Sequence, residues 1–531
     1  DVQNLSQTLQ KFATVNPETL SGSKPYTLQN RVHGKWVDSK SYTTVVDPLN
    51  GESILQVPDT NTEEEMNEFI KSSKQCPKSG LHNPFKNPER YSLYGSICRK
   101  IASVMYEPEV EAFFTKLIQR VMPKSDVQAL AEVAVTRKMI ENFSGDQVRF
   151  LLRSFNVSGD HLGQQSSGYR WPFGPVALIC PFNFPLEIPV LQLLGALFCG
   201  NKVIVKGDSR VSLVLEQFVR LSEFCGLPAT DYDFLSSDGP TMEKILLAAD
   251  VRMTQFTGSS HVANRLAEKL KGKIKIEDAG FDWKILGPDV KEFEYIAWQC
   301  DQDAYAASGQ KCSAQSILFA HENWIKANLV EKLKELAARR KLEDLTIGPV
   351  LTWDNARIKE HVDKILAIPG AKLEFGGKEL SGHKIPTQYG SYEPTAIFVP
   401  LSEIVKEENF HIVTKELFGP FQVITSYKDE ELDSVLEILE RMENHLTAAV
   451  VSNDPIFLQK IIGNTVNGTT YQGIRARTTG APQNHWFGPA GDPRGAGIGS
   501  PEAILLVWSC HREVVSDFGP ITSNWKLPPP S

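Results

Sequence analysis

Short apolar runs alternate with longer stretches of helical spacing along the first half of the chain. A continuous apolar run predicts a buried strand at 175–180, and further strands are expected at 202–206, 232–235 and 252–256. Between them, helical patterns cover 189–199 and about 212–225. Strands that alternate with helices predict a parallel sheet covered on both faces, with ligands at the carboxyl ends of the strands. The fold class is therefore α/β.

Further elements flank this set on both sides. Residues 1–30 are polar and predict a peripheral arm, and short strands are expected at 32–37 and 43–48. Helical patterns follow at 62–76, at 89–106 and through much of 109–142. A second α/β set begins near residue 284, with a helix at 322–340 and a strand at 421–424. Residues 473–500 are rich in Gly, Pro and Arg and predict loop structure.

Composition excludes several classes of protein. With 531 residues, the chain exceeds what one core supports, and we expect two or three domains. A net charge of −8 argues against a nucleic-acid binder. The eight cysteines include no CxxC pair and the histidines no HExxH, so we expect free thiols and no metal site. Prolines and polar residues interrupt the most apolar region, 174–205, which excludes a simple membrane span.

The segment Gly309–Gln315, GQKCSAQ, gives the clearest chemical signal. Gly309 permits a sharp turn, and the charge of Lys311 is expected to favour the thiolate of Cys312. The other cysteines mostly have apolar neighbours, where a cysteine commonly serves as a small core residue. Cys312 is therefore the candidate nucleophile.

Two polar side chains at strand ends are candidates to assist it. Asn183 lies between two prolines in the turn PFNFP, where its amide could stabilise an oxyanion. Glu277, in IEDAG, could activate water near a thioester. For each, the ordinary alternative is a loop asparagine bonded to nearby backbone, or a surface acid that balances Lys273 and Lys275.

Four further positions suit a nucleotide, although no strict GxGxxG occurs in the first 300 residues. Lys206 ends a strand and could contact phosphate or ribose. Ser259 is a helix-cap candidate whose following amides suit a pyrophosphate. Glu416 could hold ribose hydroxyls, and Phe418 could pack on a flat ring. A solvated lysine, an ordinary cap and a core phenylalanine are the corresponding structural alternatives.

Taken in chain order, the segments PFNFP, VIVK, FTGSS, IEDAG, GQKCSA and KELFGPF resemble the aldehyde dehydrogenase superfamily from about Val32 to Ser516. The resemblance implies a Rossmann-type cofactor domain, an α/β catalytic domain and a small β element for oligomerisation. It makes Cys312 the nucleophile, Asn183 the oxyanion donor and Glu277 the general base. It also implies NAD as the cofactor, bound by Ile179, Phe182, Lys206, Ser209, Gly239, Thr257, Gly258, Ser259, Glu416 and Phe418.

Departures from the family pattern matter for two of these roles. Ser209 stands where many NAD-using members have a glutamate, and EDAGF replaces the usual ELGGK. The variants EDAGFDWK and GQKCSAQ are similar to a branch that oxidises L-glutamate γ-semialdehyde to glutamate with NAD⁺ in mitochondrial proline breakdown. The preference for NAD over NADP follows from that branch and not from Ser209. The branch places the substrate carboxylate near Ser313, Gly495, Ala496 and Gly497.

The resemblance also divides the chain into parts. It assigns 31–146 and 171–283 to the NAD-binding domain, 284–490 to the catalytic domain, and 147–170 with 505–520 to oligomerisation strands, after the arm at 1–30. In particular, 147–152 and 511–516 are expected as strands that pair across subunits. We expect a homo-oligomer, a dimer or larger, in the mitochondrial matrix. The chain begins at Asp1, and we expect that a leader was removed or left out.

Other hypotheses remain open at this point. The substrate could be another short acidic semialdehyde, such as succinate semialdehyde. A cysteine hydrolase would need a histidine base, which none of the matched segments supplies. A catalytically silent scaffold, which would form no product, and an acyl-CoA-forming relative, which would form a CoA thioester instead of an acid, are the remaining alternatives.

Overall fold

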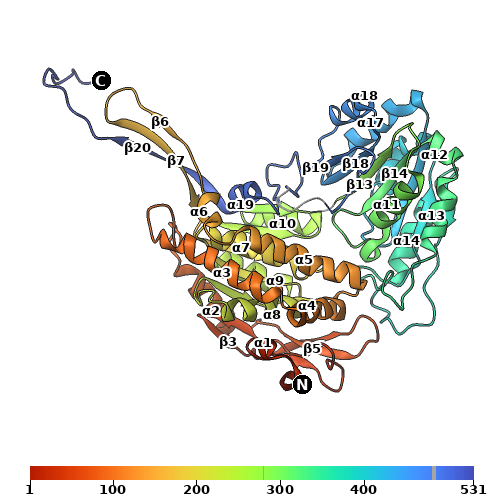
Figure 1. The fold of residues 1–531 in the computed structure, drawn as a ribbon, viewed down its shortest axis with the longest axis horizontal. Helices are drawn as coiled ribbons and strands as arrows, with labels where there is room; N and C mark the ends of the chain where they lie inside the picture. The colour runs from red at the N-terminus through yellow and green to blue at the C-terminus, as the bar shows by residue number, and fades with distance from the viewer. Residues whose placement is uncertain (279, 481–485) are drawn as a thin grey trace.

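Two seven-stranded sheets organise the computed structural model, which describes residues 1–278, 280–480 and 486–531 (Figure 1). Ala279 of the IEDAG segment and residues 481–485 lie outside the described residues. The predicted α/β class is confirmed by these sheets and the helices that cover them. None of the helices in the described part of the chain combines the length and the apolar character that a bilayer crossing requires.

The first sheet contains all four strands predicted in the first half of the chain. Its order is β12 (Ile274–Glu277), β11 (Met253–Thr257), β8 (Pro175–Ile179), β9 (Lys202–Lys206), β10 (Tyr232–Leu235), β2 (Asn30–Val32) and β3 (Lys35–Val37). The strands from β12 to β10 are parallel, and β2 and β3 add an antiparallel hairpin. The carboxyl ends of the five parallel strands therefore meet along one edge.

Helices cover both faces of this sheet. One face packs against α3 (Glu89–Met105), α4 (Pro108–Val121), α5 (Asp126–Asn142), α7 (Glu187–Phe198) and α8 (Ser212–Phe224). The other packs against α2 (Glu63–Lys74), α9 (Gly239–Ala249) and α10 (Ser260–Lys269). On β8, Val176 and Leu178 enter the first core and Ala177 the second, so a central strand buried on both faces reads as a continuous apolar run.

The second sheet forms the other lobe in Figure 1. Its order is β15 (Lys372–Phe375), β16 (Thr395–Phe398), β17 (Phe421–Tyr427), β14 (Gln315–His321), β13 (Asp282–Leu286), β18 (Thr447–Val451) and β19 (Thr469–Gln472). All neighbours are parallel except β15 and β16. Its helices include α11 (Phe293–Tyr305), α14 (Asn355–Leu366), α16 (Glu407–Val413), α17 (Leu432–Arg441) and α18 (Pro455–Ile462). Since β13 begins at Asp282, the division between the lobes falls just before the expected boundary at 283.

A long β arm projects from the first lobe (Figure 1). It consists of β6 (Asn156–Ser158), β7 (Gln164–Pro172) and β20 (Ser509–Asp517), with β7 in the centre. The expected strand at 511–516 lies within β20. The expected strand at 147–152 is wrong, because Gln147–Leu151 forms the short helix α6 and buries Val148 and Leu151. The chain enters the arm only after this helix.

Two other predictions differ from the structure. The single helix expected at 322–340 is divided into α12 (Glu322–Lys326) and α13 (Leu329–Ala337), because Asn328 adopts a left-handed φ of 64°. The arm expected at 1–30 is not peripheral throughout, since Leu9, Phe12 and Val15 are buried. The ring of Phe12 packs edge-on against Phe113 of α4 at 6.1 Å.

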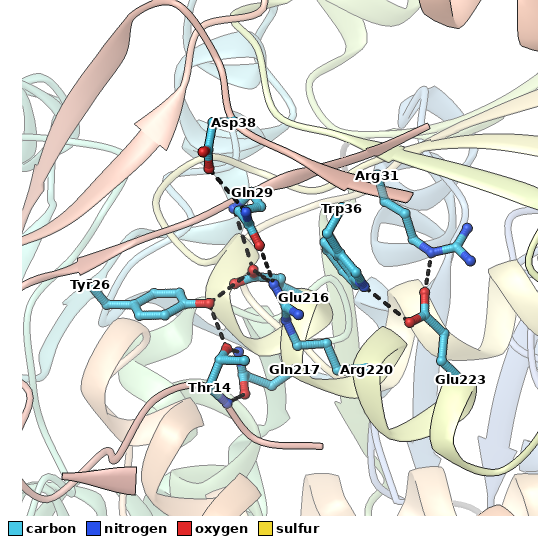
Figure 2. Close-up of polar contacts among 10 residues, drawn as sticks. All are labelled: Thr14, Tyr26, Gln29, Arg31, Trp36, Asp38, Glu216, Gln217, Arg220 and Glu223. Carbon is cyan, nitrogen blue, oxygen red and sulfur yellow. Dashed lines mark hydrogen bonds and ion pairs between the residues drawn. The ribbon is translucent and has the colours of Figure 1, made fainter. Parts of the chain in front are cut away.

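Polar contacts also hold this N-terminal segment to α8 (Figure 2). The hydroxyl of Tyr26, in the short strand β1 (Tyr26–Thr27), donates to Glu216 Oε1 at 3.0 Å. Thr14 and Gln217 exchange two hydrogen bonds, of 3.0 and 2.8 Å. Strands β1, β4 (Tyr42–Val46) and β5 (Ser53–Pro58) form a small sheet beside them. The segment is thus part of the first lobe's core.

Candidate active site

The three predicted catalytic residues meet between the two lobes. Asn183 follows β8 and Glu277 ends β12, at the carboxyl edge of the first sheet, while Cys312 precedes β14 of the second sheet. The Nδ2 of Asn183 lies 3.7 Å from Cys312 Sγ. The carboxyl group of Glu277 is close enough to Cys312 for each to influence the other's ionisation. Three residues spread over 129 positions of the chain therefore form one cluster.

A sharply folded segment presents Cys312. Three consecutive residues, Ala307, Ser308 and Gly309, have positive φ values of 54°, 55° and 70°. A side chain at Gly309 would meet the backbone oxygen of Gly419 at 2.0 Å, so only glycine fits there. Gln310 is fully buried; its Nε2 donates to Pro349 O at 3.0 Å, and its Oε1 accepts from Leu351 N at 2.9 Å. The loop before Cys312 is thus fixed by backbone contacts.

Two cavities meet at the sulfur. The larger has a volume of about 670 Å³ and is lined by Cys312, Asn183 and Glu277 together with the ends of β8, β9 and β11. The smaller has a volume of about 270 Å³ and lies between α5, α7 and the segment that follows β19. Cys312 lines both cavities. A molecule in either cavity would therefore reach the same thiol, from opposite sides.

Burial controls the ionisation of this cluster. It raises the pKa of Glu277 to about 7, and the nearby Cys312 thiol partly opposes that shift. Burial and then the charge of Glu277 raise the pKa of Cys312 well above its usual range. Neither Glu277 oxygen has a hydrogen-bond partner among the described residues. At neutral pH the pair is a thiol beside a carboxyl group that is about half ionised.

Lys311 does not act on the thiol as expected from its position in the sequence. The groups with the largest effects on Cys312, after burial, are Glu277, Glu416 and Asn183. Burial lowers the pKa of Lys311 to about 8, and its largest electrostatic interaction is with Asp303. Adjacent residues project in different directions here, so closeness in sequence overstated the effect of the lysine on the sulfur.

Comparison with known proteins identifies the family to which the chain belongs. Residues 36–490 match the aldehyde dehydrogenase family. The chain belongs to that family. It is 65% identical to "Delta-1-pyrroline-5-carboxylate dehydrogenase 12A1, mitochondrial" of Arabidopsis thaliana, over 98% of this chain and 93% of that protein. A "Probable aldehyde dehydrogenase" of Linum usitatissimum is also 65% identical, over 98% of this chain and 94% of that protein.

Solved structures agree on the fold of this aldehyde dehydrogenase. A betaine aldehyde dehydrogenase of Staphylococcus aureus superposes with a TM-score of 0.79 at 20% identity, and the match covers 96% of this chain and 98% of that chain. At that identity the likeness concerns the fold alone. Both sheets and the helices around them therefore have the arrangement of the family.

Most of the predicted cofactor residues of this aldehyde dehydrogenase line the larger cavity. They are Ile179, Phe182, Lys206, Thr257, Gly258, Ser259, Glu416 and Phe418. Among the residues described, Ser209 and Gly239 are not part of its wall. Ser209 instead donates to Ser237 O at 3.3 Å, and Gly239 is exposed at the start of α9. The neighbouring Asp208, which does line the cavity, is held by Arg210 through two side-chain bonds of 2.9 Å.

The wall of the larger cavity offers groups of the kind that a dinucleotide requires. Ser259 caps α10, so the free amides of that helix open toward the cavity beside it. Glu416 Oε2 accepts from Gly280 N at 3.0 Å, which fixes the carboxyl group, and burial raises its pKa well above the usual range. Phe418 has a left-handed φ of 56°, and its ring lies 5.8 Å from that of Phe182. Amides, a lysine, an acid and two rings therefore share one wall.

The predicted substrate-binding residues divide into two groups. Ser313 lines the smaller cavity, whereas Gly495, Ala496 and Gly497 do not. Gly495 N donates to Asp492 O at 2.8 Å, and Ala496 N donates to Ile276 O at 2.9 Å. This segment forms a parallel bridge beside β12 and so supports the strand that carries Glu277. Gly499 and Ile498, the next residues, do line the cavity.

Charged residues on the smaller cavity were not among the predicted site residues. Glu132, Glu187 and Lys311 all line it, and Lys124 is buried next to Glu132. The sequence contained one signal for them. Glu132 interrupts the apolar face of the helix predicted through 109–142, where Ala129, Val133 and Ile140 are buried. A charge on an apolar helix face usually has a buried partner or a function.

Proposed function

We propose that this chain oxidises L-glutamate γ-semialdehyde, the open form of Δ1-pyrroline-5-carboxylate, to L-glutamate with NAD⁺. The observation that carries the proposal is the meeting of two cavities at Cys312, one with nucleotide-type groups and one with charged residues on its wall. The 65% identity to the Arabidopsis protein over nearly its whole length supports this substrate over other aldehydes.

The residues of the larger cavity fit a nicotinamide dinucleotide. In this proposal Lys206 contacts the adenosine ribose, Ser259 the pyrophosphate and Glu416 the nicotinamide ribose, while Phe418 packs beside the ring. NAD⁺, when bound, supplies the acceptor for the hydride that leaves the substrate carbon. Preference for NAD⁺ is proposed from the branch, and Asp208 and Ser209 follow the ribose lysine by two and three positions.

The chain's own residues perform the other steps. Cys312 gives up its thiol proton to solvent as Sγ adds to the aldehyde carbon, and the sulfur holds the acyl group as a thioester after oxidation. Asn183 Nδ2, already 3.7 Å from Sγ, and the Cys312 backbone N–H donate to the oxyanion. Glu277 then takes a proton from the water that hydrolyses the thioester. A pKa of about 7 suits that task, because the base is substantially ionised at neutral pH and still holds protons well.

The smaller cavity suits a short substrate that carries charge. Its walls include apolar residues such as Phe184, Ile188 and Phe487, with Lys311, Glu187 and Ser313 among them. In this proposal the substrate carboxylate binds near Ser313. The turn that includes Gly495, Ala496 and Gly497 contributes indirectly, because it leads into Ile498 and Gly499, which line the cavity. A volume of about 270 Å³ is enough for a short aldehyde.

Assembly and location complete the proposal. We place the enzyme in mitochondria by likeness to the Arabidopsis protein, whose name includes that compartment. A homo-oligomer is supported by the β arm, in which β20 is an edge strand of nine residues and Val515 and Val157 are exposed. An edge of this length invites pairing with another strand.

A substrate panel tests the function. Glutamate semialdehyde, succinate semialdehyde and propionaldehyde are each supplied with NAD⁺ or NADP⁺, and NADH or NADPH formation is followed by absorbance. We expect the highest kcat/KM for glutamate semialdehyde with NAD⁺. A higher kcat/KM for succinate semialdehyde would refute the substrate. Ester cleavage without any nucleotide reduction would refute the oxidation itself and favour a hydrolase.

A further inference from the structure

The turn that carries Asn183 exposes backbone groups that neither β8 nor α7 uses. The residue before α7, Leu186, provides no side-chain cap for the helix. Two side chains from a distant part of the chain form hydrogen bonds with these backbone groups. Lys124 Nζ donates to Asn183 O at 2.9 Å. Glu132 Oε2 accepts from Leu186 N at 2.8 Å and from Glu187 N at 3.1 Å.

These two side chains form a pair that is shielded from water. Lys124 Nζ lies 3.0 Å from Glu132 Oε1, and both side chains have an exposed fraction of 0%. Lys124 Nζ also lies 4.4 Å from the centre of the Phe184 ring, so it contacts the turn at two successive residues. Burying two charges is costly, and hydrogen bonds to charged groups are stronger and more directional than neutral ones. Such a pair fixes the backbone that it binds.

The side chain of Asn183 depends on this backbone for its direction. Its Oδ1 is buried and has no hydrogen-bond partner among the described residues, and its Nδ2 faces Cys312 Sγ. Little else fixes the amide. We infer that the Lys124–Glu132 pair positions Asn183, so that Nδ2 points at the oxyanion when the thiol adds to an aldehyde. Lys124 and Glu132 are positioning residues and do not contact the substrate carbon in this role. The inference rests on the proposed function, in which Asn183 is the oxyanion donor.

A double-mutant cycle tests the inference in the full-length enzyme with glutamate semialdehyde and NAD⁺. Asn183→Ala is expected to lower kcat by about 100-fold or more, the usual effect of losing an oxyanion donor. Lys124→Met removes the charge and the bond to Asn183 O, and we expect kcat to fall by about 10-fold or more. In the Asn183→Ala background, Lys124→Met is expected to change kcat by less than about twofold, because the group that it positions is gone.

Two measurements separate positioning from a general loss of structure. The dissociation constant of NADH, followed by fluorescence, should stay within about twofold of the unaltered enzyme in Lys124→Met. Arg120→Met is the matched control, because Arg120, four residues before Lys124 at the end of α4, is also a cation that bonds to backbone oxygens, those of Pro17 and Leu20, but outside the site. It should lower the melting temperature and leave kcat within about twofold.

The outcomes distinguish failure of the inference from failure of the function. If Asn183→Ala keeps its kcat, the proposed mechanism falls and the inference falls with it. If Asn183→Ala loses activity but Lys124→Met does not, or if their effects multiply, only the inference is overturned. Should Lys124→Met not yield soluble enzyme, Glu132→Gln decides. It keeps one oxygen acceptor and should lower kcat by at least about threefold in the unaltered background and not in Asn183→Ala.

Discussion

The substitution Glu277→Gln separates the proposed base from the rest of the site. Glutamine has almost the same shape, so Asn183, Cys312 and both cavities should keep their places. What changes is a buried carboxyl group beside Cys312, whose pKa burial has raised to about 7. Removal of a general base typically lowers a rate by about 10²- to 10⁴-fold. We expect the steady-state rate with glutamate semialdehyde to fall within that range.

The pH dependence provides the sharper test. With a pKa of about 7, the ionised fraction of Glu277 rises from about one tenth at pH 6 to about nine tenths at pH 8. The rate of thioester hydrolysis should therefore rise about tenfold over that interval in the unaltered enzyme. In Glu277→Gln it should be flat there. The sign follows from the role of the group, because a base must be deprotonated to accept a proton from water.

Stopped-flow absorbance at the NADH wavelength measures both steps. In Glu277→Gln the first turnover should still release about one NADH per site, because the nucleophile and oxyanion donor remain, and later turnovers should be slow. Asp278→Asn is the matched control, since it removes a neighbouring carboxyl group from the same cavity wall and should preserve the pH dependence. A steady-state rate of Glu277→Gln within threefold of the unaltered enzyme, or a tenfold rise that persists, would refute the assignment.

Three further outcomes are expected. The pKa of Glu277 is raised from 4.5 to about 7 in the folded protein, so ionisation of this group lowers the free energy of unfolding as pH rises between these two values. In thermal melts, Glu277→Gln should therefore be more stable than the unaltered enzyme by about 3 kcal/mol at pH 8 and little changed at pH 5. Glu416→Gln should raise the KM for NAD⁺ about tenfold in initial-rate assays and leave the semialdehyde KM nearly unchanged. Val515→Glu, on the exposed face of β20, should shift the enzyme to a smaller species in sedimentation velocity.

The sequence predicted most of the first sheet, because β8 reads as a continuous apolar run and the strands after it alternate with helical patterns. It predicted less well where the conformation of a single residue decides whether a helix continues. The helix expected at 322–340 divides at Asn328, and nothing in its periodicity marks that left-handed residue. The strand expected at 147–152 came from the family resemblance alone, and the segment is instead the helix α6, which buries Val148 and Leu151.

The site shows the same limit at the level of side chains. Strand ends predicted where Asn183, Lys206 and Glu277 would lie, because parallel strands share a carboxyl edge. Sequence adjacency did not predict direction. The charge of Lys311 interacts most strongly with Asp303 and not with the Cys312 thiol. Gly495 supports β12 with its backbone instead of lining a cavity. Such roles depend on which groups a segment meets after folding, and local patterns contain no information on that.

The catalytic groups come from different lobes of the fold, so each must be held in place by contacts within its own lobe. Cys312 belongs to the second lobe and is fixed by Gln310 against residues 349–351. Asn183 and Glu277 belong to the first lobe and, apart from their contacts with Cys312 itself, have no side-chain hydrogen bond to the described residues of the second. Their placement must therefore come from within the first lobe.

Glu277 is held by its strand and by the bridge to Gly495, whereas Asn183 lies beyond the end of β8 in a turn that pairs with no strand. The residue that lacks sheet support is the one whose backbone receives a buried cation, which is why we expect Asn183 to be the more sensitive of the two to substitutions outside the cavity.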